Sequence, residues 1–297
     1  MAEAVVERDP GRGPAVAEAL GVLEVPRRSR TWEGVRGYGL IAAMWIRSTM
    51  TYRTSFFLAT FGNAAITLLD FVGIYIMFSH VDALGGFTLP EIALLYGSCS
   101  ASLGLADLVM GNTDRVGQRI RDGSLDTMLV RPVPVLAQVA ADRFALRRLG
   151  RIGQGLGVLG WALVVLDVEW TPGRILLVPV MVVAGAAIFS AVLVAGAAFQ
   201  FVAGDAAEVQ NAFTYGGCTM LQYPPTVFAK DLLRGVTFVV PLAFVNWLPA
   251  LYILGRPDPL GLPGWVAYTS PLVAFLAFLP ASLAWRAGVR SYRSTGS

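Results

Sequence analysis

Long apolar stretches alternate with shorter polar segments along this chain, and six of the stretches are close to the length of a membrane-spanning helix. A helix needs about 20 predominantly apolar residues to cross the hydrocarbon core of a bilayer, which is about 30 Å thick. The pattern therefore predicts an all-α integral membrane protein with six transmembrane helices, over residues 55–78, 92–110, 149–166, 175–202, 235–254 and 265–285.

Three further segments do not fit a span. In residues 32–53 the apolar core is brief, so we expect a helix lying in the membrane interface; the alternative is the polar beginning of the first span. Residues 205–222 mix charged and amide side chains with a break at Gly216-Gly217, which favours an interfacial or re-entrant helix. Residues 1–31 lack periodicity and do not begin with a basic-then-apolar pattern, so we predict a disordered cytoplasmic tail and no signal peptide.

Two of the predicted spans have an unusual composition. The span over 235–254 contains Pro241 and Pro249, so we expect kinks there, and we expect Asn246 to bond carbonyls that the prolines leave free. The span over 149–166 is rich in glycines, which let a neighbouring helix backbone approach closely. These glycines are Gly150, Gly153, Gly155, Gly157 and Gly160.

The composition agrees with a membrane protein, and the positions of the charges predict its orientation. Hydrophobic residues make up 55% of the 297 residues and charged residues only 14%, whereas soluble domains carry about 25% charged residues. Arginines gather before the first span, between the second and third, and after the sixth, so the positive-inside rule places these segments and both termini in the cytoplasm. This clustering is a topology signal, and we expect no nucleic-acid partner.

The longest charged passage between two apolar stretches is TDRVGQRIRDGSLDTMLVRPVP, residues 113–134. Apolar residues recur at helical spacing on both sides of Gly123, so we expect two short amphipathic helices with a turn at Gly123, the second ended by Pro132 and Pro134. Such a pair can bind in the groove of a partner protein. The alternative is a solvated loop whose arginines only fix the topology.

Part of this passage resembles a known family. Residues 120–132, IRDGSLDTMLVRP, resemble the IR-x-G-x-LD-x-x-L-x-RP signature in the cytoplasmic loop of bacterial ABC transporter permeases of the second, exporter-like type (ABC-2). Tyr223-Pro224 and the later PLAFVNWLPA, residues 241–250, are similar to the fifth-span pattern of the same family. The two motifs occur in the expected order, and the likeness covers most of the chain from Trp32 onward.

The resemblance implies a permease domain over residues 32–297, with an elbow helix at its beginning, in the bacterial inner (plasma) membrane. It implies the membrane subunit of an ATP-driven exporter, paired with a second permease, identical or related, and with two copies of a separate ABC ATPase subunit. The loop over 113–134 would be the coupling element, with its apolar side chains packed into the ATPase and its charged ones fixing the register. The coupling residues would be Arg119, Ile120, Arg121, Asp122, Gly123, Leu125, Asp126, Met128, Leu129, Arg131 and Pro132.

Enzyme motifs are missing from the sequence. The one lysine, Lys230, does not follow a glycine-rich turn and is not followed by Ser or Thr, which excludes a phosphate-binding P-loop. We therefore expect no cofactor in this chain and expect ATP with Mg²⁺ to be bound by the partner ATPase. His80 has no catalytic partners nearby in sequence, and Cys99 and Cys218 make neither a disulfide framework nor a metal site.

Three polar residues within spans are candidates for a transport pathway: Asn63, Asp70 and Asn246. A carboxylate within a span is costly and is a functional candidate; the alternative for Asp70 is hydrogen bonding between helices. Together with Asp107, Asp70 also permits a proton-coupled secondary transporter, although no internal repeat supports that alternative. Drugs, lipids, peptides and polysaccharide precursors are all compatible with the sequence as substrates.

Overall fold

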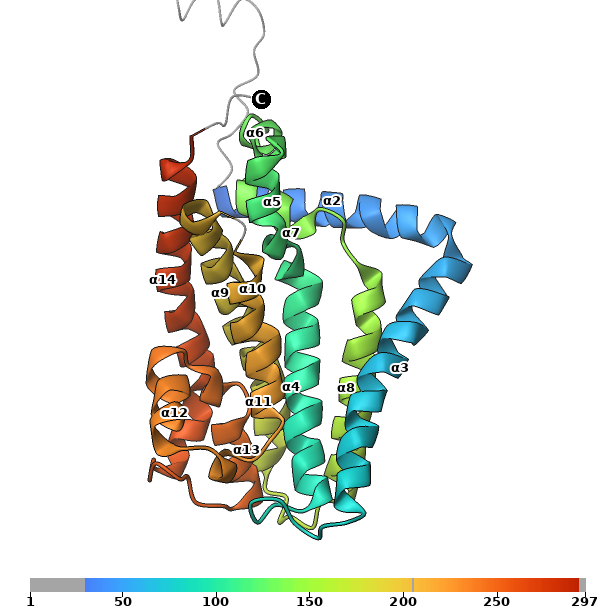
Figure 1. Ribbon diagram of the computed structural model, residues 1–297, viewed down its shortest axis with the longest axis vertical. Coiled ribbons are helices and arrows are strands. Elements are labelled where there is room, and N and C mark those ends of the chain that lie inside the picture. The colour runs from blue at the N-terminus through green and yellow to red at the C-terminus, as the bar shows by residue number, and fades with distance from the viewer. Residues whose placement is uncertain (1–29, 205, 294–297) are drawn as a thin grey trace, which may run out of the picture.

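The computed structural model describes residues 30–204 and 206–293, which form a bundle of long helices (Figure 1). Residues 1–29 of the predicted tail lie outside the described residues. The longer helices are α2 (Arg30–Thr51), α3 (Arg53–Phe78), α4 (Leu89–Met110), α8 (Leu149–Val165), α9 (Pro172–Ala203) and α14 (Ser270–Ser291). Within the described residues the only strand-like feature is one isolated bridge, between Leu84 and Phe87.

Shorter helices connect the long ones. Between α4 and α8 lie η1 (Gly111–Arg115), α5 (Val116–Arg121), α6 (Ser124–Leu129), α7 (Val135–Ala141) and η2 (Leu146–Arg148). Between α9 and α14 lie α10 (Ala207–Asn211), η3 (Ala212–Gly216), α11 (Gly217–Leu221), η4 (Pro225–Val227), α12 (Lys230–Arg234), η5 (Gly235–Val239), η6 (Leu242–Phe244), α13 (Trp247–Leu254) and η7 (Gly264–Thr269).

In the described part of the chain, four helices are long and apolar enough to cross a membrane. They are α3, α4 continued through η1 and α5 to Arg121, α9, and η7 continued into α14. The helix α8 has 17 residues and extends about 25 Å, close to the thickness of a bilayer core. The prediction of a helical membrane protein is therefore confirmed at this level, and the predicted spans 55–78, 92–110, 175–202 and 265–285 each coincide with a long helix.

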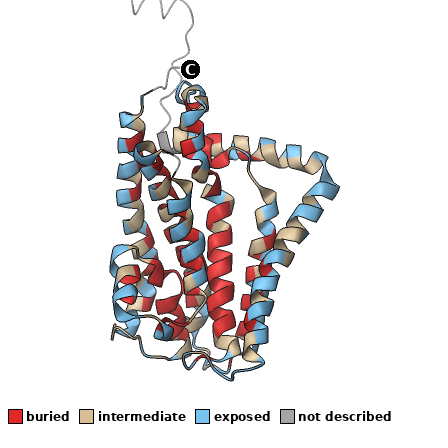
Figure 2. Cartoon of the chain, viewed as in Figure 1, coloured by how far each residue is buried: buried red, intermediate tan, exposed pale blue. Residues whose placement is uncertain are grey.

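The helix α4 is the centre of the bundle. Nearly all of its residues are buried, whereas the outer helices α3 and α14 are buried on narrow faces only (Figure 2). α4 packs against α8 and α9, and α9 packs against α14. Because α3 is so little covered by its own chain, its apolar surface is available to lipid or to another protein.

The glycines of α8 divide into two groups. A Cβ atom on Gly155 would lie 2.7 Å from the backbone nitrogen of Ala101 on α4, and one on Gly150 would collide with the carbonyl oxygen of Thr60 on α3. Close backbone approach therefore requires glycine at these two positions. Gly153, Gly157 and Gly160 have open space where a Cβ would be, so the prediction of close packing is wrong for them.

The segment predicted as the fifth span, 235–254, is not one helix. Val240 is extended in front of Pro241, because proline restricts the residue before it and lacks the N–H that would continue the helix. The helix that remains, α13, has eight residues and extends only about 12 Å. This corrects the predicted kinked span: the chain breaks into short helices at the end of the bundle opposite α6 (Figure 1).

A continuous helix instead runs through α10, η3 and α11, within the segment predicted to be interfacial or re-entrant. Its backbone stays helical through Gly216 and Gly217, so no break occurs there. The segment η3 is π-helical, with one wide turn over Ala212–Gly216. The 15 residues from Ala207 to Leu221 extend about 22 Å along α9 and α4.

Asn246 is fully buried where this helix, α13 and α4 meet. Its side-chain amide donates hydrogen bonds to the carbonyl oxygens of Leu95 (2.9 Å) and Leu221 (3.0 Å). These carbonyls belong to neighbouring helices and are not the ones that Pro241 and Pro249 leave free, which corrects the expected bonding of Asn246. The amide joins three elements at one point.

The helix α2 lies across the end of the bundle at which α5, α6 and the last residues of α14 are found (Figure 1). It packs mainly against α7 and turns into α3 at Tyr52. Tyr38 on α2 donates a hydrogen bond to the carbonyl oxygen of Val109 (3.0 Å), which fixes the helix to the end of α4. The predicted segment 32–53 is thus a separate crosswise helix as far as Thr51, and only its last residue, Arg53, belongs to α3.

Candidate coupling element and membrane cavity

Residues 113–134, which we call the coupling element, form the two short helices α5 and α6 at one end of the bundle. Gly123 joins them with φ of +68°, a left-handed conformation that glycine adopts without strain. The Asp122 carboxylate accepts hydrogen bonds from the backbone N–H (3.0 Å) and the hydroxyl (2.6 Å) of Ser124. These bonds favour the ionised carboxylate and lower the pKa of Asp122 below its ordinary value.

The inner face of the coupling element is buried in the chain's own bundle. Leu125 is 1% exposed and Met128 8%, and both belong to a cluster that includes Val194 of α9 and Trp285 of α14. The side-chain amide of Gln138 also donates to the carbonyl oxygen of Met128 (2.8 Å). This corrects the expectation that Leu125 and Met128 pack into a partner, because their side chains attach the element to the bundle instead.

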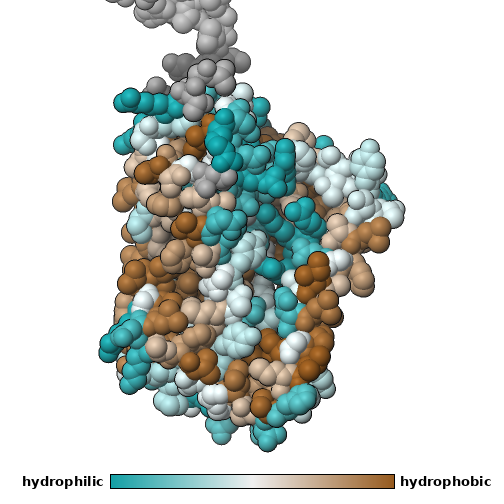
Figure 3. All heavy atoms as spheres, viewed as in Figure 1, coloured by the Kyte–Doolittle hydropathy of each residue, from teal (hydrophilic) through white to brown (hydrophobic). Residues whose placement is uncertain are grey.

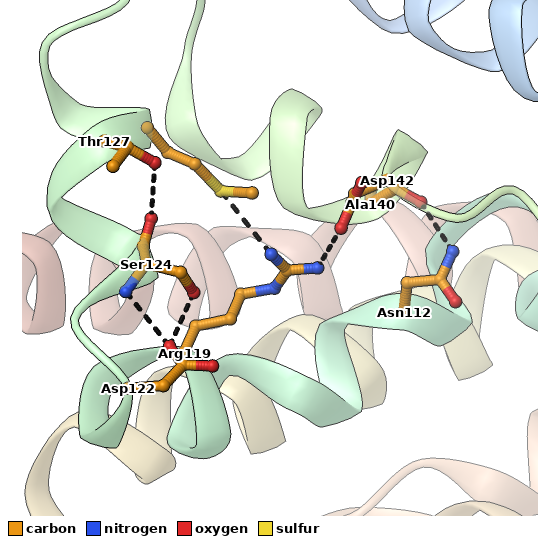
Figure 4. Close-up of polar contacts among 8 residues, drawn as sticks. Asn112, Arg119, Asp122, Ser124, Thr127, Ala140 and Asp142 are labelled. Carbon is orange, nitrogen blue, oxygen red and sulfur yellow. Dashed lines mark hydrogen bonds and ion pairs between the residues drawn. The ribbon is translucent and has the colours of Figure 1, made fainter.

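Arg119 is likewise turned inward, as Figure 4 shows. Its guanidinium forms an ion pair with Asp142, which follows α7, and reaches the Met128 sulfur at 4.0 Å. The side chains of Arg119 and Asp142 are only 11% and 24% exposed. Asn112 adds a hydrogen bond to the carbonyl oxygen of Ala140 (3.2 Å). The predicted role of Arg119 in fixing the register of a partner is corrected to a role within the chain.

Six residues of the coupling element form an exposed tip. Val130 is 85% exposed, the most exposed large apolar side chain of the element, and was not among the predicted site residues. It follows Leu129 in sequence, and two adjacent apolar residues in an arginine-rich segment are the signal that could have identified it. Ile120, Gly123 and Asp126 are partly buried. The tip consists of Arg121, Asp122, Leu129, Val130, Arg131 and Pro132.

A buried pair of glutamines connects the coupling element to two longer helices. The side-chain oxygen of Gln200, on α9, accepts a hydrogen bond from the backbone N–H of Gly117 on α5 (2.6 Å). Its side-chain nitrogen donates to the side-chain oxygen of Gln210 on α10 (3.0 Å), and both glutamines are at most 2% exposed. A displacement of α5 therefore acts directly on α9 and α10.

An open cavity of about 330 Å³ lies among α3, α4, α8 and the η3–α11 helix. Its polar lining includes Asp70, Tyr96, Arg151, Tyr215 and Gln222. On the face shown in Figure 3, polar side chains form a band that runs down from the end with α5 between the apolar surfaces of α3 and α14. A polar cavity among apolar helices is what a route through a membrane requires.

The structure does not bring the three predicted pathway residues together. Asp70 is exposed and lines the cavity. Asn246 is buried in the hydrogen bonds described above, and Asn63 is half-buried on α3 and is not part of the cavity lining. Cys218, which lines the cavity, lies 2.9 Å from Cys99, sulfur to sulfur, and both are free thiols. The two cysteines are 119 residues apart in sequence, so no local pattern indicated that their sulfurs lie close together.

Asp107, the second intramembrane carboxylate, is 4% exposed. The Tyr215 hydroxyl donates a hydrogen bond to its side-chain oxygen (2.7 Å), and Arg148 donates to its backbone carbonyl (2.6 Å). The guanidinium of Arg151 lies over the Tyr215 ring, 5.1 Å from its centre. Asp107 is therefore part of a bonded cluster joining α4, η3 and α8.

The chain is similar to one family over most of its length. A family described as ABC-2 family transporter protein matches residues 64–296. No curated protein and no solved structure matches the chain. In the part of the chain that the structure describes, no group of three or more His, Cys, Asp or Glu side chains could hold a metal ion. The chain belongs to the ABC-2 family of transporter proteins: it is a multi-pass membrane permease of an ABC transporter, whose ATPase is a separate partner.

Proposed function

We propose that this chain is the permease subunit of a bacterial ATP-driven exporter, and that its coupling element docks on the ABC ATPase through the exposed tip. The observation that carries the proposal is the division of the element into two faces. Its inner face is fixed to α9 and α14 by Leu125, Met128 and the Arg119–Asp142 pair, while the tip projects beyond the bundle. An element that is attached to the bundle by one face and exposed at its tip can transmit force from a partner to the helices.

The proposed topology has six crossings with the coupling element on the cytoplasmic side. They are α3, α4, α8, α9, the α10–α11 helix and α14, and the short helices between Lys230 and Leu254 enter and leave from the outer side. In this arrangement α2 is the interfacial elbow helix, and both ends of the chain are cytoplasmic, in the inner membrane. The outer side carries Lys230 and the arginines Arg174, Arg234 and Arg256, yet the arginines still concentrate at the cytoplasmic end.

The proposed assembly contains two permeases and two ATPase subunits. The exposed apolar surface of α3, including Phe57, Phe61 and Leu69, is available to lipid or to the second permease, identical or related. The ATPase subunits bind ATP with Mg²⁺. Their closure moves the tips, and the contact of Gln200 with Gly117 passes that movement to α9 and α10. The proton-coupled alternative has less support, since Asp107 is engaged by Tyr215.

Co-purification tests the docking directly. The tagged chain is expressed with its ATPase subunit and extracted in mild detergent, and the ATPase that remains bound is measured. We expect Val130→Asp or Arg131→Glu to remove at least about nine-tenths of the bound ATPase. The first change puts a negative charge at an apolar position of the tip, and the second reverses a positive charge there. The control Val81→Asp, on an exposed residue at the opposite end, should retain it.

The proposal is wrong if the ATPase stays bound to both tip variants and ATP-dependent transport continues. Leu125→Asp is not a clean test, because a carboxylate at a position only 1% exposed would disrupt the element itself.

A further inference from the structure

Asp70 is an exposed carboxylate at membrane depth. It lies on α3 eight residues before Phe78, about 12 Å from that end of the helix. Its side chain is exposed and lines the cavity, and in residues 30–204 and 206–293 no hydrogen bond or ion pair to it is found. A bare carboxylate at this depth is costly, so it requires a cation or a proton.

The other charges around the cavity already have partners. Arg151, which also lines it, lies over the ring of Tyr215, and that tyrosine bonds to Asp107. No ion pair joins Arg151 to Asp70 in the part of the chain that the structure describes. Asp70 is the one carboxylate in the cavity lining, and no bonded partner there compensates its charge.

Aromatic rings gather beside this carboxylate. Tyr96 lines the cavity within electrostatic reach of Asp70, and the Phe71 ring lies 5.2 Å from that of Tyr96 and 6.3 Å from that of Trp161. The faces of aromatic rings attract cations. The apolar side chains of Ile74 and Leu103 complete this part of the lining. Phe71 and Trp161 do not line the cavity themselves, but the rings of Tyr96, Tyr215 and Tyr223 do. A carboxylate, tyrosine rings and apolar walls in one cavity suit a positively charged group on an apolar body.

We propose that the cavity among α3, α4, α8 and the η3–α11 helix binds amphipathic organic cations, with the Asp70 carboxylate as their counter-ion. This inference rests on the proposed transport function and names its class of substrate. A cavity of about 330 Å³ is at the small end of ligand pockets, so it takes the charged group and its nearest apolar atoms. The exposed side of α3 leaves room for the rest of the molecule toward the lipid.

The test uses two probes of nearly the same shape and opposite charge, tetraphenylphosphonium and tetraphenylborate. The full chain, with the ATPase that co-purifies, is placed in nanodiscs of phosphatidylcholine, and probe binding is measured by equilibrium dialysis after subtraction of empty nanodiscs. The variants are Asp70→Asn, which keeps the shape and removes the charge, and Asp70→Glu, which keeps the charge. Asp82→Asn, on an exposed loop residue, is the matched control.

We expect the native chain to bind the cation at least about tenfold more tightly than the anion. Asp70→Asn should weaken cation binding by about tenfold to a hundredfold, because the amide carries no charge to attract the phosphonium. Asp70→Glu should retain most of the affinity and Asp82→Asn all of it. Equal binding of the two probes by the native chain would overturn the proposal even if Asp70→Asn failed to fold. Unchanged cation binding by a folded Asp70→Asn chain would also overturn it.

The two proposals fail separately. Probe binding needs neither nucleotide nor a bound ATPase, so its failure leaves the docking of the coupling element unaffected. Loss of docking in Val130→Asp should in turn leave cation binding unchanged, because Val130 lies at the far end of the coupling element and does not line the cavity.

Discussion

Neutralising Asp142 while Arg119 stays in place should loosen the coupling element. Asp142→Asn leaves a guanidinium that is only 11% exposed without its counter-ion. Arg119→Met instead leaves the Asp142 carboxylate, which is 24% exposed and can be hydrated. We therefore expect Asp142→Asn to be the more damaging single change. The double variant should recover much of the loss, since apolar or neutral replacements of both partners remove the unpaired charge.

The magnitude follows from the burial of the pair. Breaking a fully buried ion pair costs about 3–5 kcal/mol. Since Asp142 is about a quarter exposed, solvent screening reduces that cost, and we expect about 2–3 kcal/mol for Asp142→Asn. At about 1.4 kcal/mol per factor of ten, the population of the locally opened element should rise by about 30- to 140-fold.

Limited trypsin digestion of the purified chain measures this opening through cleavage after Arg121, which is exposed on the tip. When the opened element recloses faster than trypsin cleaves it, the cleavage rate follows the opened population. The rate should therefore fall in the order Asp142→Asn, Arg119→Met, double variant and native chain. Arg131→Met, an exposed substitution, should leave the rate after Arg121 unchanged. The reasoning is refuted if the double variant is cleaved as fast as the two single effects predict when added, because the pair would then carry no coupling energy.

Three further changes test other contacts. Gln200→Leu removes the acceptor for the Gly117 amide, so hydrogen exchange of α5 should accelerate by about tenfold to a hundredfold. An unchanged exchange rate would contradict the contact between α5 and α9. Gly155→Val should lower thermal stability and extraction yield because its Cβ would meet the α4 backbone, whereas Gly157→Val, facing open space, should not; equal effects would contradict this packing. Because the pKa of Asp122 is lowered, the stabilisation from its hydrogen bonds to Ser124 should be constant from pH 8 to 5 and be lost as the pH falls below about 4. The loss should appear as faster hydrogen exchange of α6 after correction for intrinsic rates, and a loss near pH 6 would contradict the assignment.

Much of the architecture followed from local pattern. Apolar length predicted α3, α4, α9 and α14, and the helical spacing around Gly123 predicted α5 and α6. These features depend on residues close in sequence. The error at 235–254 arose because hydropathy averages over a window, whereas Pro241 and the extended Val240 interrupt the backbone at one point.

The candidate site was less predictable because burial depends on distant residues. Leu125 and Val130 look alike as apolar residues of an amphipathic segment, yet Leu125 packs against helices more than 60 residues away while Val130 projects outward. Arg119 pairs with Asp142 within the chain, whereas the pattern assigned Arg119 to a partner surface. Asp107 has a hydrogen-bond partner and Asp70 has none among the described residues. This difference depends on Tyr215, which is 108 residues from Asp107 in sequence.

Site-specific photo-crosslinking at Val130 tests the central claim most directly. A benzoylphenylalanine placed there, at the exposed tip, should form a covalent adduct with the ABC ATPase subunit in intact cells, and the same group at Val164, an equally exposed residue of α8, should not. The adduct should be identified by mass spectrometry as a P-loop ATPase and should disappear in Arg131→Glu. A tip that crosslinks only to lipid or to another part of the same chain would contradict the account.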